Sequence, residues 1–213
     1  MDPIKTNQNK FDINSEFIIF DVETTGLSPI DGDKIIEIAG LKVQNLKVTG
    51  KFHSLIDPER DIPFGASSVN GITNDMVIGA SKARDVLPRF RSFAGSSAMV
   101  GHNIRFDMDF LCHGLAMIGE RIEPVVVVDT MRLAREFIPQ LGRYPLWRVA
   151  AHFAIKDGQT HRAMADVELT FEVFKKLTPL IGSRNILQIG SLEYDFAAFR
   201  ELSLKMQQGT FQW

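Results

Sequence analysis

The hydrophobic and polar positions in the first quarter of the chain predict three consecutive β-strands. Branched and aromatic residues run without a break over residues 17–20, a pattern typical of a strand that is buried on both faces. Residues 34–43 and 47–56 read as two further strands, with a short turn at Gln44 and Asn45 between them. Strands linked so closely most simply form an antiparallel meander, so we expect these three to lie in one sheet.

The rest of the chain alternates predicted helices with short apolar strands. Ser81 is placed as an N-cap, and Asp129 and Pro145 mark two further helix starts. The expected elements are a helix at 82–94, a strand at 98–101, a helix at 104–118, a strand at 125–128, and helices that end near 137, 153 and 177. Antiparallel strands followed by alternating strands and helices predict an α/β fold, a mixed sheet with helices on both faces.

The same pattern suggests three parts of the chain. Residues 1–15 are polar and are expected to form a flexible tail. Residues 16–180 are expected to form one domain, and residues 181–213 a helical C-terminal extension. In the extension, apolar residues such as Ile186, Phe196 and Phe199 recur at helical spacing, which predicts one or two amphipathic helices. We expect them to pack on the domain, with binding of a partner or a second copy as the alternative.

Two carboxylates interrupt the first strand. Because side chains alternate across a strand, Asp21 and Glu23 point to the same side of it. Like charges on one face of a buried strand repel and are poorly solvated, and a divalent cation would neutralise them. Magnesium binds a few carboxylate oxygens and is commonly shared with substrate phosphates. An isolated Asp-x-Glu pair at a strand end is more often simply solvated, so this interpretation depends on further acids.

Two further acids are predicted to face the core. Asp107 lies in the first turn of a predicted helix, where the helix dipole favours negative charge, and it shares the apolar face with Phe110 and Leu111. Its neighbour Asp109 falls on another side of the helix, which we expect to face solvent. Asp166 falls on the inward stripe of the last long helix. A carboxylate on a core face needs a partner, whereas one on a solvent face does not.

His161 lies in the loop just before the helix that carries Asp166. A lone loop histidine is more often incidental than catalytic, but its titration near neutrality suits a general base. We expect His161 and the acids Asp21, Glu23, Asp107 and Asp166 to converge at one end of the sheet. Four acids around two cations is the composition of two-metal phosphoryl chemistry, in which the ions lie roughly 3.5–4 Å apart.

Composition narrows the class of protein. The 213 residues are 45% hydrophobic and 23% charged, as in an ordinary globular domain. Because the net charge is −2, attraction to nucleic acid has to come from a local patch or from metals. The single cysteine, Cys112, fits a reducing compartment. The chain has no apolar run of membrane-spanning length and no signal peptide, so we expect a cytoplasmic protein with no membrane partner.

The order of these motifs resembles the DEDDh exonuclease family, which includes the proofreading subunit of bacterial DNA polymerase III, ribonuclease T and oligoribonuclease. The resemblance rests on Phe20-Asp21-Val22-Glu23-Thr24-Thr25-Gly26-Leu27, then His102-Asn103 with Phe106-Asp107, and then His161 five positions before Asp166. It extends over residues 17–180, with supporting matches at 35–38, 69–73 and 128–130. One departure is Asn70, which stands where many members have histidine, so contacts near that loop are open.

The resemblance implies a ribonuclease-H-like fold and hydrolysis of phosphodiester bonds from the 3′ end, with release of nucleoside 5′-monophosphates. It implies that Asp21, Glu23, Asp107 and Asp166 bind two divalent ions, Mg²⁺ or Mn²⁺, and that His161 deprotonates the attacking water. The residues expected to contact nucleic acid are Thr24, Thr25, Gly26, Leu27, His102, Asn103, Arg105, Phe106 and Arg162. Apolar groups such as Leu27 and Phe106 would hold any base by stacking, although core packing explains Phe106 almost as well.

Other functions stay open at this point. We expect a substrate of single-stranded DNA, but an RNA-directed exonuclease differs only in the sugar, and no residue can be assigned to reading the 2′-hydroxyl. A binding module that acts through its tail in a replication complex is the alternative from another class. Its partner would be a DNA polymerase or a sliding clamp, because residues 207–211 faintly resemble clamp-binding peptides. A homodimer is also open.

Overall fold

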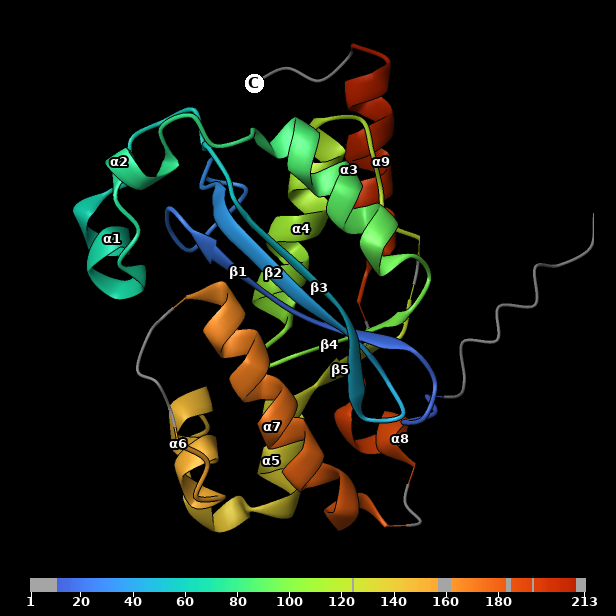
Figure 1. Cartoon of the computed structure of the whole chain (residues 1–213). Helices are drawn as coiled ribbons and strands as arrows, with labels where there is room; N and C mark the ends of the chain where they lie inside the picture. The colour runs from blue at the N-terminus through green and yellow to red at the C-terminus, as the bar shows by residue number, and fades with distance from the viewer. Residues whose placement is uncertain (1–10, 124, 157–161, 183–184, 193, 210–213) are drawn as a thin grey trace, which may run out of the picture.

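The computed structural model describes residues 11–123, 125–156, 162–182, 185–192 and 194–209. Within these residues the centre of the protein is a five-stranded sheet in the order β3-β2-β1-β4-β5 (Figure 1). The strands are β1 (Phe17–Thr24), β2 (Ile35–Gln44), β3 (Lys47–Leu55), β4 (Ala98–Gly101) and β5 (Val127–Asp129). The first three strands form an antiparallel meander, whereas β4 pairs parallel to β1 and β5 parallel to β4. The mixed sheet expected from the sequence is confirmed.

Helices cover both faces of the sheet. Figure 1 shows α3, α4 and α9 on one face, α5, α6, α7 and α8 on the other, and α1 with α2 beyond the end of the sheet where β1 ends. Their bounds are α1 (Phe64–Asn70), α2 (Asn74–Val77), α3 (Ala83–Ala94), α4 (Arg105–Met117), α5 (Thr130–Phe137), η1 (Pro139–Leu141), α6 (Leu146–His152), α7 (Ala163–Ile181), α8 (Ile186–Gly190) and α9 (Phe196–Gln207). In the part of the chain that the structure describes, no helix is both long and apolar enough to cross a membrane.

The alternation of side chains along β1 divides the core into two layers. Phe17 and Ile19 pack into the cluster that includes residues of α5, α6 and α7. Ile18, Phe20 and Val22 pack into the cluster on the other face, with residues of α3 and α4. Because successive side chains of a strand point to opposite faces, a continuous apolar run such as this one supplies both layers at once.

Several local predictions need correction. The sequence did not predict α1 and α2, because helices of seven and four residues are too short to show a clear period. Ser81 is not the cap of α3, whose N-cap position is Lys82 without a side-chain hydrogen bond. Asp129 does cap α5, since its carboxylate accepts a hydrogen bond from the amide of Met131 at 2.8 Å.

The C-terminal extension contains α8 and α9, and both pack on the domain. Gly190 of α8 lies close to Leu133 of α5, and Phe196 and Phe199 join the core cluster on the α4 side. This packing corrects the prediction for Asp109, which does not face open solvent. Its carboxylate accepts a hydrogen bond from the hydroxyl of Tyr194 at 2.7 Å. Helical periodicity marked that side of α4 as polar but could not show that a distant segment covers it.

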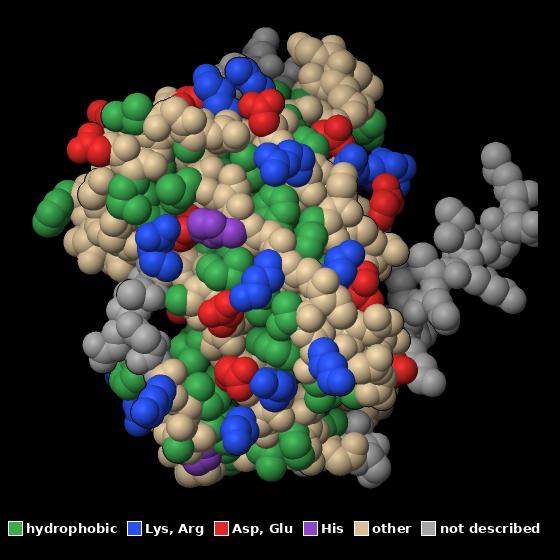
Figure 2. All heavy atoms as spheres, in the orientation of Figure 1, with side chains coloured by type: hydrophobic (Ala, Val, Ile, Leu, Met, Phe, Trp, Pro, Cys, Tyr) green, Lys and Arg blue, Asp and Glu red, His purple; other side chains and the backbone are tan. Residues whose placement is uncertain are grey.

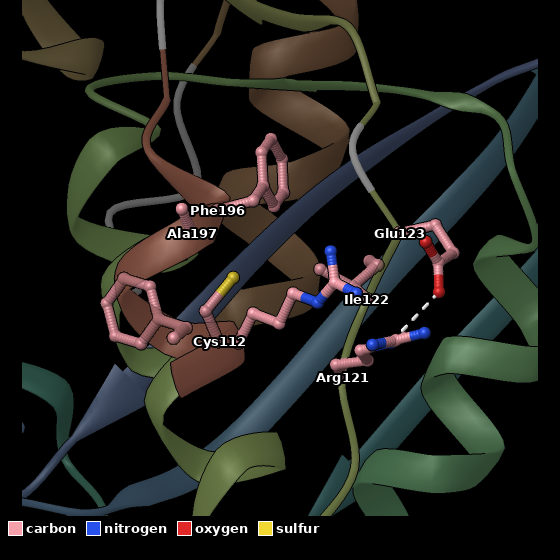
Figure 3. A pocket seen from close by; sticks show the side chains of 8 residues that line it. Cys112, Arg121, Ile122, Glu123, Phe196 and Ala197 are labelled. Atoms are coloured by element: carbon pink, nitrogen blue, oxygen red, sulfur yellow. Dashed lines mark hydrogen bonds and ion pairs between the residues drawn. The ribbon is translucent and has the colours of Figure 1, made fainter. Parts of the chain in front are cut away.

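A pocket lies between α4 and the extension, away from the predicted site. Figure 3 shows Cys112 at its floor, with Phe196 and Ala197 on one side and residues 121–123 on the other. Arg121 and Glu123 pair at 3.1 Å at its edge. Burial raises the pKa of the Cys112 thiol to about 12, so this cysteine is an unreactive core group.

Candidate active site

Three of the four predicted acids come together at the end of β1. Asp21 and Glu23 continue the side of β1 that carries Phe17 and Ile19, which is the face that α7 covers. Asp166 lies in the first turn of α7. One carboxylate oxygen from each of Asp21, Glu23 and Asp166 lies within 4.8 Å of the others. The alternation of the strand and the start of the helix therefore bring two distant parts of the sequence to one point.

Asp107 approaches the same strand from the opposite layer. It is 3% exposed in the first turn of α4, and its Oδ1 accepts a hydrogen bond from the amide of Val22 at 3.0 Å. β4 pairs with β1 only from Phe17 to Ile19, so Asp107 meets an amide beyond the end of that pairing. Its carboxylate is close enough to Asp21 to raise the pKa of that group, although it is not part of the three-carboxylate cluster.

The carboxylates repel one another and are poorly hydrated. Burial first, and then the charges of Asp107 and Glu23, raise the pKa of Asp21 well above its ordinary value. Burial also raises the pKa of Asp107. Burial together with Asp166 and Glu37 raises the pKa of Glu23 to about 8. Such a cluster binds protons in the absence of other positive charge, and hard oxygen ligands at this spacing suit a divalent cation such as Mg²⁺ or Mn²⁺.

Glu37 is a fifth acid beside the cluster, and the sequence assigned it no role. It pairs across the sheet with Glu23 and is 1% exposed. Its carboxylate accepts hydrogen bonds from Nε and Nη2 of Arg162 at 3.0 and 2.6 Å, and from the amide of Ala163 at 3.0 Å. It also bonds Nε2 of His53 at 2.7 Å. Burial disfavours its ionisation, but these bonds outweigh burial and hold the pKa of Glu37 below its ordinary value.

The consequence of this network is structural. Arg162 and Ala163 are the N-cap and the first residue of α7, so Glu37 fixes the start of that helix to the sheet. Arg162 as a phosphate contact stays a prediction, because Nε and Nη2 are bonded to Glu37 while the side chain is still 35% exposed. A charged residue within the apolar run of residues 35–41, all of them buried, was the signal that could have identified Glu37.

The loop after β1 is shaped by its own polar side chains. Thr24 and Thr25 are buried. The hydroxyl of Thr24 donates to the carbonyl of Gly26 at 2.6 Å, and that of Thr25 donates to Asp33 at 3.2 Å. A Cβ at Gly26 would collide with the Asp33 carboxylate, so a larger residue there would displace the acceptor of the Thr25 hydroxyl. Leu27, at 86% exposure, is left projecting into solvent.

Asn70, the departure from the family pattern, holds this loop in place. It is buried, and its side-chain amide donates to the carbonyl of Thr24 at 3.3 Å. Its Oδ1 accepts from the amide of Ile72 at 3.0 Å, and a hydrogen bond from Asn70 also lowers the pKa of Glu23. Asparagine at this position therefore links α1 to the cluster.

The second motif occupies the turn between β4 and α4. Nε2 of His102 bonds the carbonyl of Tyr144 at 2.6 Å, and Nδ1 bonds the hydroxyl of Thr130 at 2.8 Å. Burial lowers the pKa of His102. With both ring nitrogens bonded inside the protein, His102 ties the end of β4 to two other segments, and neither nitrogen is available to a phosphate. The interpretation of its ring as a nucleic-acid contact is corrected accordingly.

The other residues of this motif differ in accessibility. Asn103 is exposed, with φ of 61°, and its amide donates to Asp129 at 3.0 Å. Phe106 is half-buried, and its ring lies 4.9 Å from that of Phe110, so it combines packing with partial exposure. Arg105 lies over the ring of Tyr194 at 5.9 Å. His161, the predicted general base, lies outside the described residues.

The stability of the metal-free protein should depend on pH through this cluster. The pKa of Glu23 is about 8 in the folded protein against an ordinary value of 4.5, so protonation favours the folded state. This contribution is complete below the ordinary pKa and is lost as the pH rises through about 8. In chelator, the melting temperature should fall over that interval, and saturating Mg²⁺ should remove the decline. Thermal denaturation at a series of pH values measures it, and the dependence should be weaker in Glu23→Gln.

Comparison with known proteins identifies the class first. The solved structure of exonuclease X in complex with 5′ overhanging duplex DNA matches with a TM-score of 0.64 and 23% identity, over 88% of this chain and 99% of that one. The zinc-bound complex of E. coli exonuclease I with single-stranded DNA matches with a TM-score of 0.68 and 20% identity, over 80% of this chain and 41% of that one. At such identities the likeness shows the fold, which is the ribonuclease-H-like fold of exonucleases.

The family follows from the sequence comparisons. The model of the RNase_T exonuclease family matches residues 18–174. DNA polymerase III PolC-type of Caldanaerobacter subterraneus subsp. tengcongensis is 35% identical over 193 residues, and that of Clostridium perfringens is 36% identical over 173 residues. These matches cover 89% and 81% of this chain but only 14% and 12% of the relatives. The chain belongs to the exonuclease family, in its DEDDh group of 3′–5′ exonucleases.

Proposed function

We propose that this chain removes nucleotides one at a time from the 3′ end of single-stranded DNA and releases nucleoside 5′-monophosphates. The observation that carries the proposal is the convergence of Asp21, Glu23 and Asp166 at the end of β1, with Asp107 reaching the same strand from α4. Ionisation of these neighbouring acids is costly unless positive charge is present. Divalent cations supply that charge and can be shared with the phosphates of a substrate.

Asp21, Glu23, Asp107 and Asp166 would hold two divalent ions, Mg²⁺ or Mn²⁺. When bound, these ions supply the positive charge that activates water and stabilises the leaving oxygen. Asp21 and Glu23 are fixed on a central strand, and Asp166 is fixed on a helix whose start is bonded to Glu37. Rigid elements of this kind hold ligands at constant separation, which is what in-line displacement requires.

His161 would accept the proton of the attacking water. It is the residue before Arg162 in the sequence, and the bonds from Arg162 to Glu37 keep this end of α7 beside the acids. A neutral imidazole is a suitable base near neutral pH. Replacement of His161 by alanine should therefore remove proton transfer while leaving the acids in place.

The terminal nucleotide would lie along the loop after β1. The backbone of Thr24, Thr25 and Gly26 would run beside it, because the threonine hydroxyls are bonded within the protein. Leu27 is the exposed apolar side chain of this loop, and with the half-exposed ring of Phe106 it would contact bases. Apolar contact with a base face tolerates every sequence, as an enzyme that works along a strand requires.

A role in proofreading during DNA replication is the proposed context. The similarity to PolC-type DNA polymerase III supports a DNA polymerase as partner and a cytoplasmic location. For a sliding clamp, the relevant tail begins at Gln207, whose side-chain amide donates to the carbonyl of Gly119, while residues 210–211 lie outside the described residues. A homodimer has no observation in its favour.

A paired digestion tests the proposal. Purified protein is given 5′-labelled single-stranded DNA or RNA of the same sequence, with Mg²⁺, with Mn²⁺ and with chelator. We expect a metal-dependent ladder that shortens from the 3′ end, faster on DNA, and its loss in His161→Ala. A preference for RNA would replace the DNA-directed proposal by a ribonuclease. Absence of cleavage of both substrates by folded, metal-loaded protein would favour a binding module.

A further inference from the structure

A basic surface lies on the segment that contains α5, η1 and α6. From residue 130 to residue 156 there are five positive side chains against one negative, a local charge of +4 in a chain whose total is −2. The positive residues are Arg132, Arg135, Arg143, Arg148 and Lys156, and the negative one is Glu136. Figure 2 shows several Lys and Arg side chains on the lower part of the visible face, where α6 and α7 lie in Figure 1. This is the kind of local patch that the overall charge does not reveal.

The same segment of the sequence contains an exposed tryptophan. Trp147, in the first turn of α6, is 56% exposed. A single exposed apolar side chain is ordinary on the surface of a domain, so Trp147 is informative only together with the positive residues of the same segment. Tyr144 lies just before α6, and the guanidinium of Arg135 stacks over its ring at 5.9 Å. This segment therefore contains both aromatic rings and guanidinium groups, and one pair of them, Arg135 and Tyr144, is in contact.

The arginines of this surface are available to a ligand. Among the described residues, Arg132, Arg143 and Arg148 have no acidic partner within 4.0 Å, and Arg135 contacts only the sulfur of Met131 and the Tyr144 ring. Arg162 differs, because Glu37 holds it in a bidentate pair. The cations next to the motifs in sequence are thus engaged, whereas those near Trp147 are not.

This surface is joined directly to the active site. The carbonyl of Tyr144 is bonded to Nε2 of His102 at 2.6 Å, in the turn that leads into α4 and Asp107. Asp129 ties the same turn to the start of α5 through the amide of Asn103 at 3.0 Å. Pro145 precedes α6 at its N-cap and restricts the backbone between the two sites. The bond between Tyr144 and His102 therefore holds the segment that leads into α6 beside the turn that leads to Asp107, which would let one nucleic-acid strand reach both.

We propose that Arg143, Trp147 and Arg148 form a second binding site for single-stranded nucleic acid, at a distance from the scissile bond. A base upstream of the cleaved end stacks on the indole of Trp147, and the two guanidinium groups contact the flanking phosphates. The site rests on the proposed exonuclease function, which it deepens by making substrate length matter. The local charge favours a polyanion over an apolar protein partner for this surface.

The test compares substrates of different length in Trp147→Ala. A nucleoside 5′-(p-nitrophenyl phosphate) ester reaches only the carboxylates, whereas a single strand of about 12 nucleotides also reaches the second site. We expect the KM for the long strand to rise about 10-fold, with kcat on both substrates and KM for the ester unchanged. Trp147→Phe, which keeps an aromatic face, should restore most of the loss. Leu204→Ala, at a residue 43% exposed on α9, is the matched control and should change nothing.

Binding is measured separately so that failure of the enzyme and failure of this site can be told apart. Fluorescence anisotropy of a labelled single strand is recorded in chelator with Asp21→Asn, which is expected not to cleave, with and without Trp147→Ala. Weaker binding of the double variant supports the site even if the parent protein proves inactive. The proposal would be overturned if Trp147→Ala left both the KM for the long strand and the binding affinity unchanged. It would also be overturned if Trp147→Ala impaired hydrolysis of the ester as much as hydrolysis of the long strand.

Discussion

Replacing Asp21 by asparagine is expected to abolish hydrolysis and to make the metal-free protein more stable. The carboxylate is one of three whose oxygens lie within 4.8 Å, and its pKa is raised by burial and by Asp107 and Glu23. Asparagine has a similar shape but no charge, so it relieves the repulsion at any pH at which the Asp21 carboxylate is ionised. It also removes a proposed metal ligand, and loss of several kcal/mol of transition-state stabilisation corresponds to at least about a 10³-fold fall in kcat.

Two measurements on the same variant check this expectation. Hydrolysis of labelled single-stranded DNA in Mg²⁺ should be undetectable or nearly so, while the melting temperature in chelator should rise by roughly 2–4 °C. In Mg²⁺ the order should reverse, because the parent protein gains from the bound ions and the variant gains less. Asp31→Asn, the same substitution at an exposed loop position, is the control. Cleavage at the parent rate by Asp21→Asn would remove this residue from the site.

Replacing Glu37 by alanine is expected to impair both stability and catalysis. The change leaves the guanidinium of Arg162, the amide of Ala163 and His53 without their shared acceptor. Removing one partner of a buried pair costs about 3–5 kcal/mol. We expect about 3 kcal/mol here, because the side chain of Arg162 is 35% exposed and water can replace part of the interaction. The start of α7 would then be less well fixed against the sheet.

The expected catalytic effect of Glu37→Ala follows from the proposed roles of Asp166, in the first turn of α7, and of His161, which precedes Arg162 in the sequence. Loss of a residue that orients metal ligands typically costs 10–100-fold in metal affinity or activity. We therefore expect a higher Mg²⁺ requirement together with a lower kcat, and a smaller defect in Glu37→Gln, which keeps one acceptor oxygen. Lys51→Ala, on the neighbouring strand β3, breaks an exposed ion pair with Glu168 of α7 and should change stability by less than about 1 kcal/mol. An unchanged Mg²⁺ requirement in Glu37→Ala would contradict the positioning role.

Some features of the site were readable from local sequence alone. The two-residue spacing of Asp21 and Glu23 fixes them on one face of a strand, whatever surrounds that strand. Helical spacing likewise placed Asp107 and Asp166 on inward faces, where both lie in the structure. The two-residue period of strands and the 3.6-residue period of helices also predicted the mixed sheet and most of the longer elements. These properties are local, so a single sequence determines them.

Other features depended on contacts between distant segments. Glu37 and Arg162 are separated by 125 positions, and no local pattern shows that one binds the other. His102 has the sequence context of a ligand-binding residue, yet its ring bridges two segments of the protein. Helical spacing places Asp109 on a side of α4 that should face solvent, yet Tyr194 from the C-terminal extension bonds to it. In each case the hydrogen-bond partner, rather than the residue, decides the role.

The sequence by itself thus determined the class of chemistry, because four acids on inward faces require positive charge wherever they meet. It also determined the elements that carry them. Only the tertiary structure decided which cations are already paired, since Arg162 is bound by Glu37, whereas Arg143 and Arg148, close to the exposed Trp147 in the sequence, have no acidic partner among the described residues. The physical reason is that periodicity reports the face of an element on which a side chain lies, whereas ion pairing and burial depend on what the fold places opposite that face.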